Sequence, residues 1–373
     1  MEERYLGESI KKLGFGLMRL PKIGKEEDIE QVKKMVDRFM EKGFTYFDTA
    51  YVYDGGKSEN ALRDAVALRY PRDRFVCASK LPLWDAKSHE QLWDLAQESL
   101  DRSGVEFFDF YLLHCMEDET IKKADSLDAW GFMREFKAAG KARHIGFSFH
   151  DTADVLEGLL SAHPEVEFVQ LQINYKDWDD ADVQSRKCYE VCRKFNKPVI
   201  IMEPVKGGAL ATMTPKVTEL FKNAAPERSL ASWAIRFAAS LDGVITVLSG
   251  MSNEAQMDDN LSFMENFEPL SEDEQAVIRE AVEIINSIPT IPCTACRYCC
   301  DGCPMQINIP SVFRAANDYK IYGNLEKAKR MYEEAVKDGG RAGDCIQCGQ
   351  CEEHCPQHIS IIEELQNAAG LFD

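Results

Sequence analysis

The sequence predicts an α/β protein made of a (β/α)8 TIM barrel and a small, mainly helical C-terminal domain. Eight short apolar runs alternate with longer helix-like stretches over roughly 240 residues, which is the pattern of such a barrel. Several of these runs are apolar almost throughout, as expected for parallel strands that are buried on both faces. The second domain is indicated by the cysteines, since nine of the thirteen lie between Cys293 and Cys355.

The expected strands are separated by amphipathic stretches. The strands are expected at residues 12–18, 45–50, 75–80, 110–114, 144–149, 168–173, 199–204 and 245–250. In residues 26–42, Ile29, Val32 and Val36 recur at helical spacing, so this is the first expected helix. A doubly wound open sheet is the alternative fold, but it requires a glycine-rich fingerprint after the first strand. Only a single Gly-x-Gly stands there, so the barrel is favoured.

One more helix and a break mark the end of the barrel domain. Ser271 is followed three residues later by Glu274, a capping box that predicts a helix over residues 271–286. The next six residues contain two prolines, which a helix interior does not tolerate. We therefore predict a barrel domain at residues 1–286 and a cysteine-rich domain at residues 287–373.

Charge and hydropathy exclude several classes of partner. The chain has 44 lysines and arginines against 63 acidic residues, a net charge of −19, so a nucleic acid would be repelled. No apolar run approaches the roughly 18 residues of a membrane helix, and the first seven residues lack the apolar stretch of a secretion signal. We expect a cytoplasmic protein with no membrane partner. Because disulfides are rare in the cytoplasm, thirteen cysteines indicate a bound group.

Two cysteine motifs of identical spacing occupy the C-terminal domain. Each has the form Cys-x2-Cys-x2-Cys-x3-Cys-Pro, and together they comprise Cys293, Cys296, Cys299 and Cys303, then Cys345, Cys348, Cys351 and Cys355. This spacing resembles that of ferredoxins with two [4Fe–4S] clusters. A structural zinc site is the alternative, but zinc favours paired Cys-x2-Cys halves.

The resemblance to two-cluster ferredoxins also implies which cysteines are ligands, because each cluster there takes three cysteines of one motif and the fourth of the other. One cluster is expected on Cys293, Cys296, Cys299 and Cys355, and the other on Cys345, Cys348, Cys351 and Cys303. The extra Cys300 is expected not to be a ligand. The insertion at residues 310–337 has helical periodicity, so residues 293–363 resemble the α-helical ferredoxins that act as wires inside larger oxidoreductases.

Residues 43–59 read GFTYFDTAYVYDGGKSE and strongly resemble the signature of the aldo-keto reductases. The resemblance extends over residues 12–270 and includes the segment LGFGLMRLP at the first expected strand. It implies the reduction of an aldehyde or ketone with NADPH or NADH, or the reverse oxidation. It also implies a catalytic tetrad, whose members here are Asp48, Tyr53, Lys80 and His114. All four lie at or just after the ends of expected strands, where such barrels build their sites.

Proton transfer explains the residue types of this tetrad. A hydride that reaches a carbonyl carbon leaves an alkoxide, and the resemblance assigns Tyr53 as the acid that protonates it. The usual pKa of tyrosine is near 10, so we expect the positive charge of Lys80 to lower it. Asp48 is expected to pair with Lys80 and hold it charged, and His114 to orient the substrate carbonyl by a hydrogen bond.

The resemblance implies a nicotinamide cofactor site as well. Its expected members are Gly16, Met18, Asp48, Ser148, Gln170, Met202, Glu203, Pro204, Val205, Ser249, Gly250, Met251, Gln256, Asp259 and Asn260. Phe149 stands where the family commonly has an asparagine, and Met202 where it has an aromatic residue. Gly250 and Gln256 replace the basic residues that often bind a 2′-phosphate, so NADH is expected to serve as readily as NADPH.

The leading interpretation is thus a reductase of a small carbonyl compound that carries two [4Fe–4S] clusters. Nicotinamide transfers two electrons as hydride, whereas each cluster passes one. The clusters therefore exchange electrons with a redox protein partner, act one electron at a time on a substrate, or stabilise the fold. Two alternatives remain: an electron-transfer subunit whose barrel is a docking platform, and a non-redox interaction protein with zinc in its C-terminal domain.

Overall fold

The computed structural model describes residues 5–181, 183–293, 295–300, 302–355 and 357–373, so Pro356 of the second cysteine motif lies outside the described residues. The chain divides into two compact units. Met1–Gly207 and Ala231–Gln275 form one, here called the barrel unit, and Gly208–Leu230 and Ala276–Asp373 form the other, here called the cysteine unit. Residues 208–230, which are part of the barrel sequence, thus belong to the cysteine unit. The single domain boundary between residues 286 and 287 stays a prediction.

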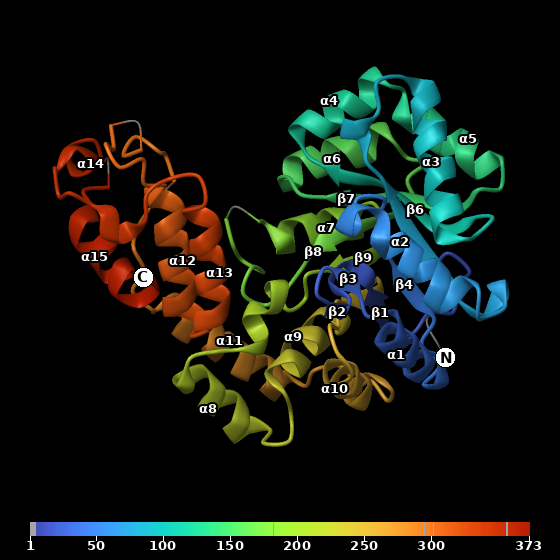
Figure 1. The fold of residues 1–373 in the computed structure, drawn as a ribbon. Helices are drawn as coiled ribbons and strands as arrows, with labels where there is room; N and C mark the ends of the chain where they lie inside the picture. The colour runs from blue at the N-terminus through green and yellow to red at the C-terminus, as the bar shows by residue number, and fades with distance from the viewer. Residues whose placement is uncertain (1–4, 182, 294, 301, 356) are drawn as a thin grey trace. The chain divides into compact units, whose positions relative to one another are not determined.

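Eight parallel strands close the predicted barrel, in the order β1-β10-β9-β8-β7-β6-β5-β4 (Figure 1). Their bounds are β1 Leu13–Gly16, β4 Tyr46–Asp48, β5 Val76–Leu81, β6 Phe108–Met116, β7 Ala142–Phe149, β8 Phe168–Gln172, β9 Val199–Met202 and β10 Val244–Ser249. Every expected strand is present. The first is shorter than expected because a 3-10 turn begins at Leu17, which carries Met18 to the surface.

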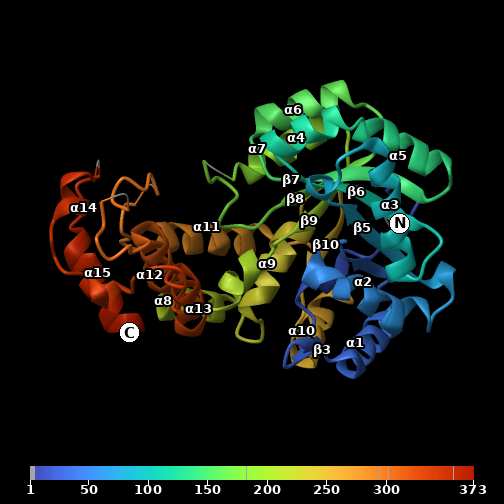
Figure 2. The same ribbon diagram turned by 45° about the horizontal axis from the view of Figure 1, so that its top comes forward.

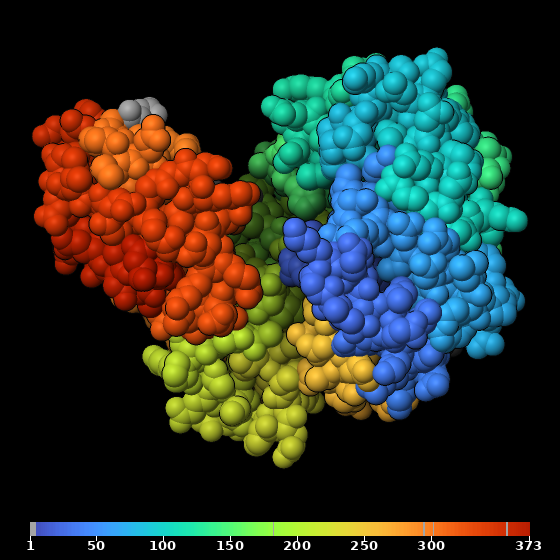
Figure 3. Space-filling view, viewed as in Figure 1, coloured from blue at the N-terminus to red at the C-terminus, as the bar shows by residue number. Residues whose placement is uncertain are grey.

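Helices follow most of the strands, and those of the barrel unit surround the barrel (Figures 1 and 2). Their bounds are α1 Ile29–Glu41, α2 Lys57–Leu62, α3 His89–Ser103, α4 Asp118–Ser126, α5 Ala129–Ala138, α6 Ala153–Ala162, α7 Ser185–Lys194, α9 Leu230–Ala239 and α10 Glu254–Met264. Two further helices of the barrel sequence, α8 Pro215–Ala224 and most of α11 Glu272–Asn286, belong to the cysteine unit. In the space-filling view, residues of the first half of the chain form most of the visible surface of the barrel unit (Figure 3).

Local capping residues decide where two of the predicted helices, α1 and α11, begin. The helix predicted over residues 26–42 was placed too early, because β3 Glu26–Glu27 pairs with β2 Lys22–Ile23 and Asp28 caps α1 by accepting from the Gln31 amide. The capping box before α11 is confirmed. The Glu274 amide donates to Ser271 Oγ at 3.2 Å, and the Ser271 amide donates to the Glu274 carboxylate at 2.9 Å.

The barrel unit has two apolar layers. Inside the barrel, large side chains fill the lumen, among them Tyr46, Phe110, Phe168 and Ile200. A larger layer packs the outer faces of the strands against the helices. The filled lumen leaves the C-terminal ends of the strands as the place where polar side chains gather.

The cysteine unit is helical and has its own core, as predicted. Its helices beyond the barrel sequence are α12 Ile309–Tyr322, α13 Leu325–Ala335, α14 Gln350–Glu353 and α15 Ile361–Phe372. The predicted helical insertion is two helices because Gly323, with φ 68°, ends α12. Buried Phe313, Tyr332 and Leu365 belong to the core. Among the residues that the structure describes, no helix is both long and apolar enough to cross a membrane.

Candidate active site and cysteine cavities

The four tetrad candidates lie on three neighbouring strands. Asp48 is the last residue of β4, Lys80 is the residue before the last in β5, and His114 lies near the end of β6. The strand registers pair Asp48 with Ala78 and Lys80 with Leu112, so the three residues meet at the C-terminal end of the barrel. Tyr53 begins the 3-10 turn that follows β4. The barrel therefore brings all four predicted residues to one place.

Lys80 and Asp48 form the buried ion pair that the sequence led us to expect. Lys80 is 1% exposed and Asp48 3%. The Lys80 ammonium donates to Asp48 Oδ1 at 2.6 Å and to the Thr49 carbonyl oxygen at 2.7 Å. Burial would lower the pKa of Lys80, but the Asp48 carboxylate raises it, and the net shift is upward. Burial raises the pKa of Asp48, and Lys80 offsets part of that shift.

Tyr53 lies against this pair. The Lys80 nitrogen is 4.8 Å from the centre of the Tyr53 ring, and the ring of His114 is 5.8 Å away, nearly perpendicular. We expected Lys80 to lower the pKa of Tyr53. It does act in that direction, but burial is the larger effect and the net shift of the Tyr53 pKa is upward. The phenol is therefore protonated at neutral pH.

His114 is also uncharged at neutral pH. Burial, reinforced by the charge of Lys80, lowers the pKa of His114 to about 3. Its ring lies 5.3 Å from that of Trp84, which is 45% exposed in the turn after β5. The sequence interpretation missed Trp84, because nothing in its local pattern distinguishes an exposed aromatic residue at the mouth of the barrel from one in the core.

Three buried polar atoms at this end of the barrel have no hydrogen-bond partner among the described residues. They are Asp48 Oδ2, His114 Nδ1 and Gln170 Oε1. Native proteins satisfy most buried polar groups, so these three atoms are available to form hydrogen bonds with a ligand.

The expected nicotinamide contacts lie on adjacent strands. Ser148 on β7 and Gln170 on β8 are register partners, and both are 1% exposed. Ser148 Oγ accepts from the Cys115 amide at 2.8 Å, so its own hydrogen is available to donate. Together with the unpaired Gln170 oxygen, this supplies a donor and an acceptor side by side, which is what a carboxamide requires.

The remaining predicted cofactor residues follow the neighbouring strands. Three of them are the last residues of their strands: Gly16 of β1, Met202 of β9 and Ser249 of β10. The others lie just after these strands: Met18 after β1, Glu203, Pro204 and Val205 after β9, and Gly250 and Met251 after β10. Gln256, Asp259 and Asn260 lie in α10, where Asn260 donates to Ser249 Oγ at 2.7 Å and holds the helix to the strand. Gln256 Oε1 accepts from the Ser252 amide at 2.7 Å.

A cation that the sequence interpretation missed lies in this part of the site. Arg19, exposed in the turn after β1, places its guanidinium nitrogens 3.5 Å from where a side chain on Gly207 would begin. The same arginine borders Gly250. Lys206, Gly207 and Gly208 all have positive φ, and successive amides in such turns form anion-binding concavities. Lys206 itself is engaged, because it donates to both carboxylate oxygens of Asp177.

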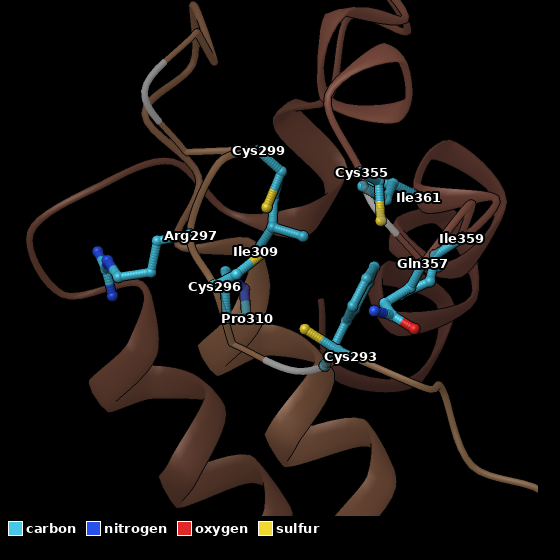
Figure 4. Close-up of a pocket in the computed structure, with 11 residues that line it drawn as sticks. Cys293, Cys296, Arg297, Cys299, Ile309, Pro310, Cys355, Gln357, Ile359 and Ile361 are labelled. Atoms are coloured by element: carbon cyan, nitrogen blue, oxygen red, sulfur yellow. The ribbon is translucent and has the colours of Figure 1, made fainter.

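The cysteines of the two motifs line two separate cavities. The first cavity is lined by Cys293, Cys296, Cys299, Cys355, Arg297, Ile309, Pro310, Phe313, Gln357, Ile359 and Ile361 (Figure 4). The second cavity is lined by Cys303, Cys345, Cys348, Cys351, Pro304, Met305, Ile307, Ile309, Ile346, Ile362 and Leu365. Each cavity thus holds three cysteines of one motif and the last cysteine of the other. Cys300 lines neither.

The chemistry of these cavities fits a cationic group bound by thiolates. Burial raises the pKa of Cys299 to about 12 and that of Cys351 to about 11, so these thiols ionise at neutral pH only beside positive charge, such as that of iron. No three His, Cys, Asp or Glu side chains of the described residues converge closely enough for a single metal ion. The cysteines of each set line a cavity instead, and Figure 4 shows the sulfurs of the first set around theirs.

Two families match the chain. Residues 12–283 match the aldo/keto reductase family, and residues 292–360 match the 4Fe-4S dicluster domain. The chain is 28% identical over 158 residues to the aldo-keto reductase AKR2E4 of Bombyx mori, covering 40% of this chain and 51% of that protein. It is 32% identical over 153 residues to the uncharacterized oxidoreductase YqkF of Bacillus subtilis, covering 36% and 48%. The chain thus spans about half the length of these relatives.

Solved structures share the barrel. An aldo-keto reductase of Klebsiella pneumoniae in complex with NADPH superposes with a TM-score of 0.58 at 20% identity, over 74% of this chain and 92% of that one. The aldo-keto reductase AKR11C1 of Bacillus halodurans superposes with a TM-score of 0.59 at 21% identity, over 75% and 96%. At these identities the likeness shows the fold, and the predicted fold class is confirmed.

Proposed function

This chain belongs to the aldo/keto reductase family, and we propose that it reduces an aldehyde or ketone to the alcohol with a nicotinamide cofactor. The observation that carries the proposal is the convergence of Tyr53, His114 and the buried Lys80–Asp48 pair at the end of the barrel, beside buried polar atoms that await a ligand. When bound, the reduced cofactor supplies the hydride for the carbonyl carbon. The protein supplies the proton for the carbonyl oxygen.

The charge states of the residues suit this direction of reaction. Because the pKa of Tyr53 is raised by burial, its hydroxyl carries the proton that the developing alkoxide takes. Lys80, held charged by Asp48, stabilises the phenolate that remains. His114 is neutral, so one ring nitrogen donates to the carbonyl oxygen and orients it. In the reverse oxidation Tyr53 must first lose its proton, which favours alkaline conditions.

The cofactor is proposed to bind across the ends of β7, β8, β9 and β10. Ser148 and Gln170 would hold the carboxamide of the nicotinamide. Arg19 and the left-handed loop that contains Gly207 would hold the pyrophosphate through charge and backbone amides. Neither Gly250 nor Gln256 offers a charge to a 2′-phosphate, so we propose that NADH is accepted as readily as NADPH. The related Klebsiella reductase was solved with NADPH.

We further propose that the cysteine unit binds two [4Fe–4S] clusters. Cys293, Cys296, Cys299 and Cys355 would hold one, and Cys345, Cys348, Cys351 and Cys303 the other. The match to the dicluster domain and the sorting of these eight cysteines into two cavities support this assignment. Bound clusters would supply one-electron carriers, so a redox protein partner is proposed to exchange electrons with them. Thiols and clusters of this kind persist in the reducing cytoplasm, where we place the protein.

The barrel is the working part in this proposal. An electron-transfer subunit that used the barrel only as a docking platform would have no need of Tyr53 beside a buried lysine, and this pair therefore favours the reductase. The test is turnover of a carbonyl panel by the anaerobically purified chain, with either cofactor, against Tyr53→Phe. Turnover is expected to fall by about 10²-fold or more, since proton donation contributes about 10²–10⁴-fold.

Tyr51→Phe is the matched control for this test. Tyr51 is two residues away, and its hydroxyl donates to the Glu98 carboxylate on the outside of the barrel at 2.8 Å. Its variant should keep wild-type turnover, and Tyr53→Phe should keep cofactor binding, measured by fluorescence titration. Near wild-type turnover by Tyr53→Phe on every substrate would show that another group is the acid.

The cluster assignment has a separate test. The anaerobic protein should contain about eight irons and eight acid-labile sulfides per chain, as two such clusters require. Stoichiometric zinc in a colourless protein would contradict it and would favour the interaction protein with a zinc site.

A further inference from the structure

The two cysteine cavities are related by an internal repeat with an offset of 52 residues. Adding this offset to a residue of the first motif gives its equivalent in the second, so Cys293 corresponds to Cys345 and Ile307 to Ile359. The backbone repeats as well. The Ile309 amide donates to the Ile307 carbonyl at 2.9 Å, and the Ile361 amide donates to the Ile359 carbonyl at 2.8 Å. Differences between the cavities can therefore be read position by position.

Gln357 of the first cavity corresponds to Met305 of the second. Each lines its own cavity. The first cavity therefore has a side-chain amide that can donate a hydrogen bond, at the position where the second has a thioether that cannot. Gln357 lies on the side of Cys293 and Cys355 in the close-up of the first cavity (Figure 4). Among the described residues that line the second cavity, those other than its cysteines are apolar.

Among the residues that the structure describes, two charged side chains near the cavities differ in the same sense. Arg297 lines the first cavity beside Cys296, with its guanidinium directed outward, and its equivalent is Gly349 (Figure 4). Near the second cavity, the Glu352 carboxylate accepts from the amide of Ile362, a lining residue, at 2.8 Å. The equivalents of these two residues are Cys300 and Pro310, so the first cavity has neither that carboxylate nor the amide that binds it.

Solvent exposure does not offset these differences. In both motifs the second cysteine, Cys296 or Cys348, is exposed, and the third, Cys299 or Cys351, is buried. Reduction adds one negative charge to a [4Fe–4S] cluster, so its potential rises with nearby positive charge and with hydrogen bonds to its sulfurs, and falls with nearby negative charge. The amide, the cation and the carboxylate all act in one direction.

We propose that the cluster of the first cavity has the higher reduction potential, with Gln357 and Glu352 as the residues that separate the two potentials. This rests on the proposed binding of two clusters. Ile309 lines both cavities, so the clusters adjoin and a single electron added to the protein resides mainly on the first. The second cluster is then the stronger reductant of the two.

The test is a titration of the anaerobic full-length protein with dithionite, followed by electron paramagnetic resonance. Two one-electron steps are expected. Gln357→Met, which copies the second cavity, should move only the step of higher potential, and should lower its equilibrium constant about tenfold, or 59 mV. Met305→Gln should raise only the step of lower potential by a similar factor. Gln366→Met, an exposed glutamine of α15 that lines neither cavity, is the control and should move neither.

The outcomes separate this inference from the proposed function. A protein with about eight irons whose two clusters titrate together, or whose Gln357→Met variant shifts the lower step, would overturn the inference and leave cluster binding intact. If Gln357→Met loses iron, Met305→Gln and Glu352→Gln decide the matter, since both should raise the lower step. A protein with fewer than about eight irons would refute the binding of two clusters itself.

Discussion

Asp48→Asn is expected to destabilise the barrel strongly, because it removes the counter-charge of a buried lysine. Lys80 is 1% exposed, and its ammonium donates hydrogen bonds to Asp48 and to the Thr49 carbonyl oxygen. An asparagine at this position still offers an oxygen that can accept from the ammonium, but it carries no negative charge. Removing one partner of a buried pair costs about 3–5 kcal/mol, because the remaining charge stays out of water without compensation. For a domain of this size, that corresponds to a melting temperature lower by roughly 6–20 °C.

A double-mutant cycle distinguishes lost pairing from a general disturbance. Lys80→Met alone leaves Asp48 unpaired and should cost about as much, whereas the double variant should be less destabilised than the sum of the single variants, because no buried charge remains. Thermal unfolding followed by tryptophan fluorescence measures all three. Glu157→Gln is the control, since Glu157 and Lys194 pair at 2.5 Å on the surface, where such pairs are worth about 0–1 kcal/mol.

The pH dependence gives a second signature. In the wild type the pKa of Lys80 is raised by Asp48, so the pair stabilises the fold below the usual lysine pKa, and this contribution is lost as the pH rises through the raised value. In Asp48→Asn the carboxylate no longer opposes burial, so we expect the pKa of Lys80 to fall and the destabilisation to be greatest at low pH. The difference in the free energy of unfolding between the wild type and Asp48→Asn should therefore become smaller from pH 7 to pH 10. A variant no less stable than the control at pH 7 would refute the pairing of two buried charges.

Three further predictions concern proton transfer, cofactor choice and cluster ligands. The rate of carbonyl reduction should show no inflection near pH 6.5, because His114 with a pKa of about 3 is neutral there. The rate of alcohol oxidation should rise with pH as Tyr53 loses its proton. An inflection of the reduction rate near pH 6.5 that vanishes in His114→Ala would contradict the first expectation. NADH should bind within about tenfold of NADPH by fluorescence titration, and Gln256→Arg should shift the preference toward NADPH; a wild-type preference above a hundredfold would point to an unrecognised cation. Cys300→Ala should leave the iron content unchanged and Cys303→Ala should lower it, whereas loss of iron in Cys300→Ala alone would reverse the ligand assignment.

Much of the candidate site could be predicted because residues 43–59 resemble the aldo-keto reductase signature, which implies the tetrad, and because most of its members end strands. The polar residues Asp48, Lys80 and His114 come at the ends of apolar runs, and in a barrel all such ends meet at one face. The strand pattern does not show how deeply each side chain is buried. The net upward shift of the Tyr53 pKa depends on how completely the phenol is buried, which outweighs the charge of Lys80.

Arg19 and Trp84 were missed for a related reason. Each lies in a turn after a strand, and its role depends on which other loops stand opposite. Arg19 borders Gly207 and Gly250, which are about 190 and 230 residues away in the sequence, and no local pattern encodes that proximity. Trp84 remains exposed because the turn after β5 holds it at the mouth of the barrel beside His114.

The sequence by itself determined the features that depend on short, regular spacing: eight strands with their helices, the cap of α11, and the grouping of eight cysteines into two motifs. Periodicity and ligand spacing are properties of neighbouring residues, so they survive without knowledge of the fold. Only the tertiary structure decided how deeply each group is buried, which distant loops lie beside each other, and that Gln357 and Met305 line the two cavities. Those properties arise when distant segments pack together and exclude water, and burial and neighbouring charges then set the charge of each group together.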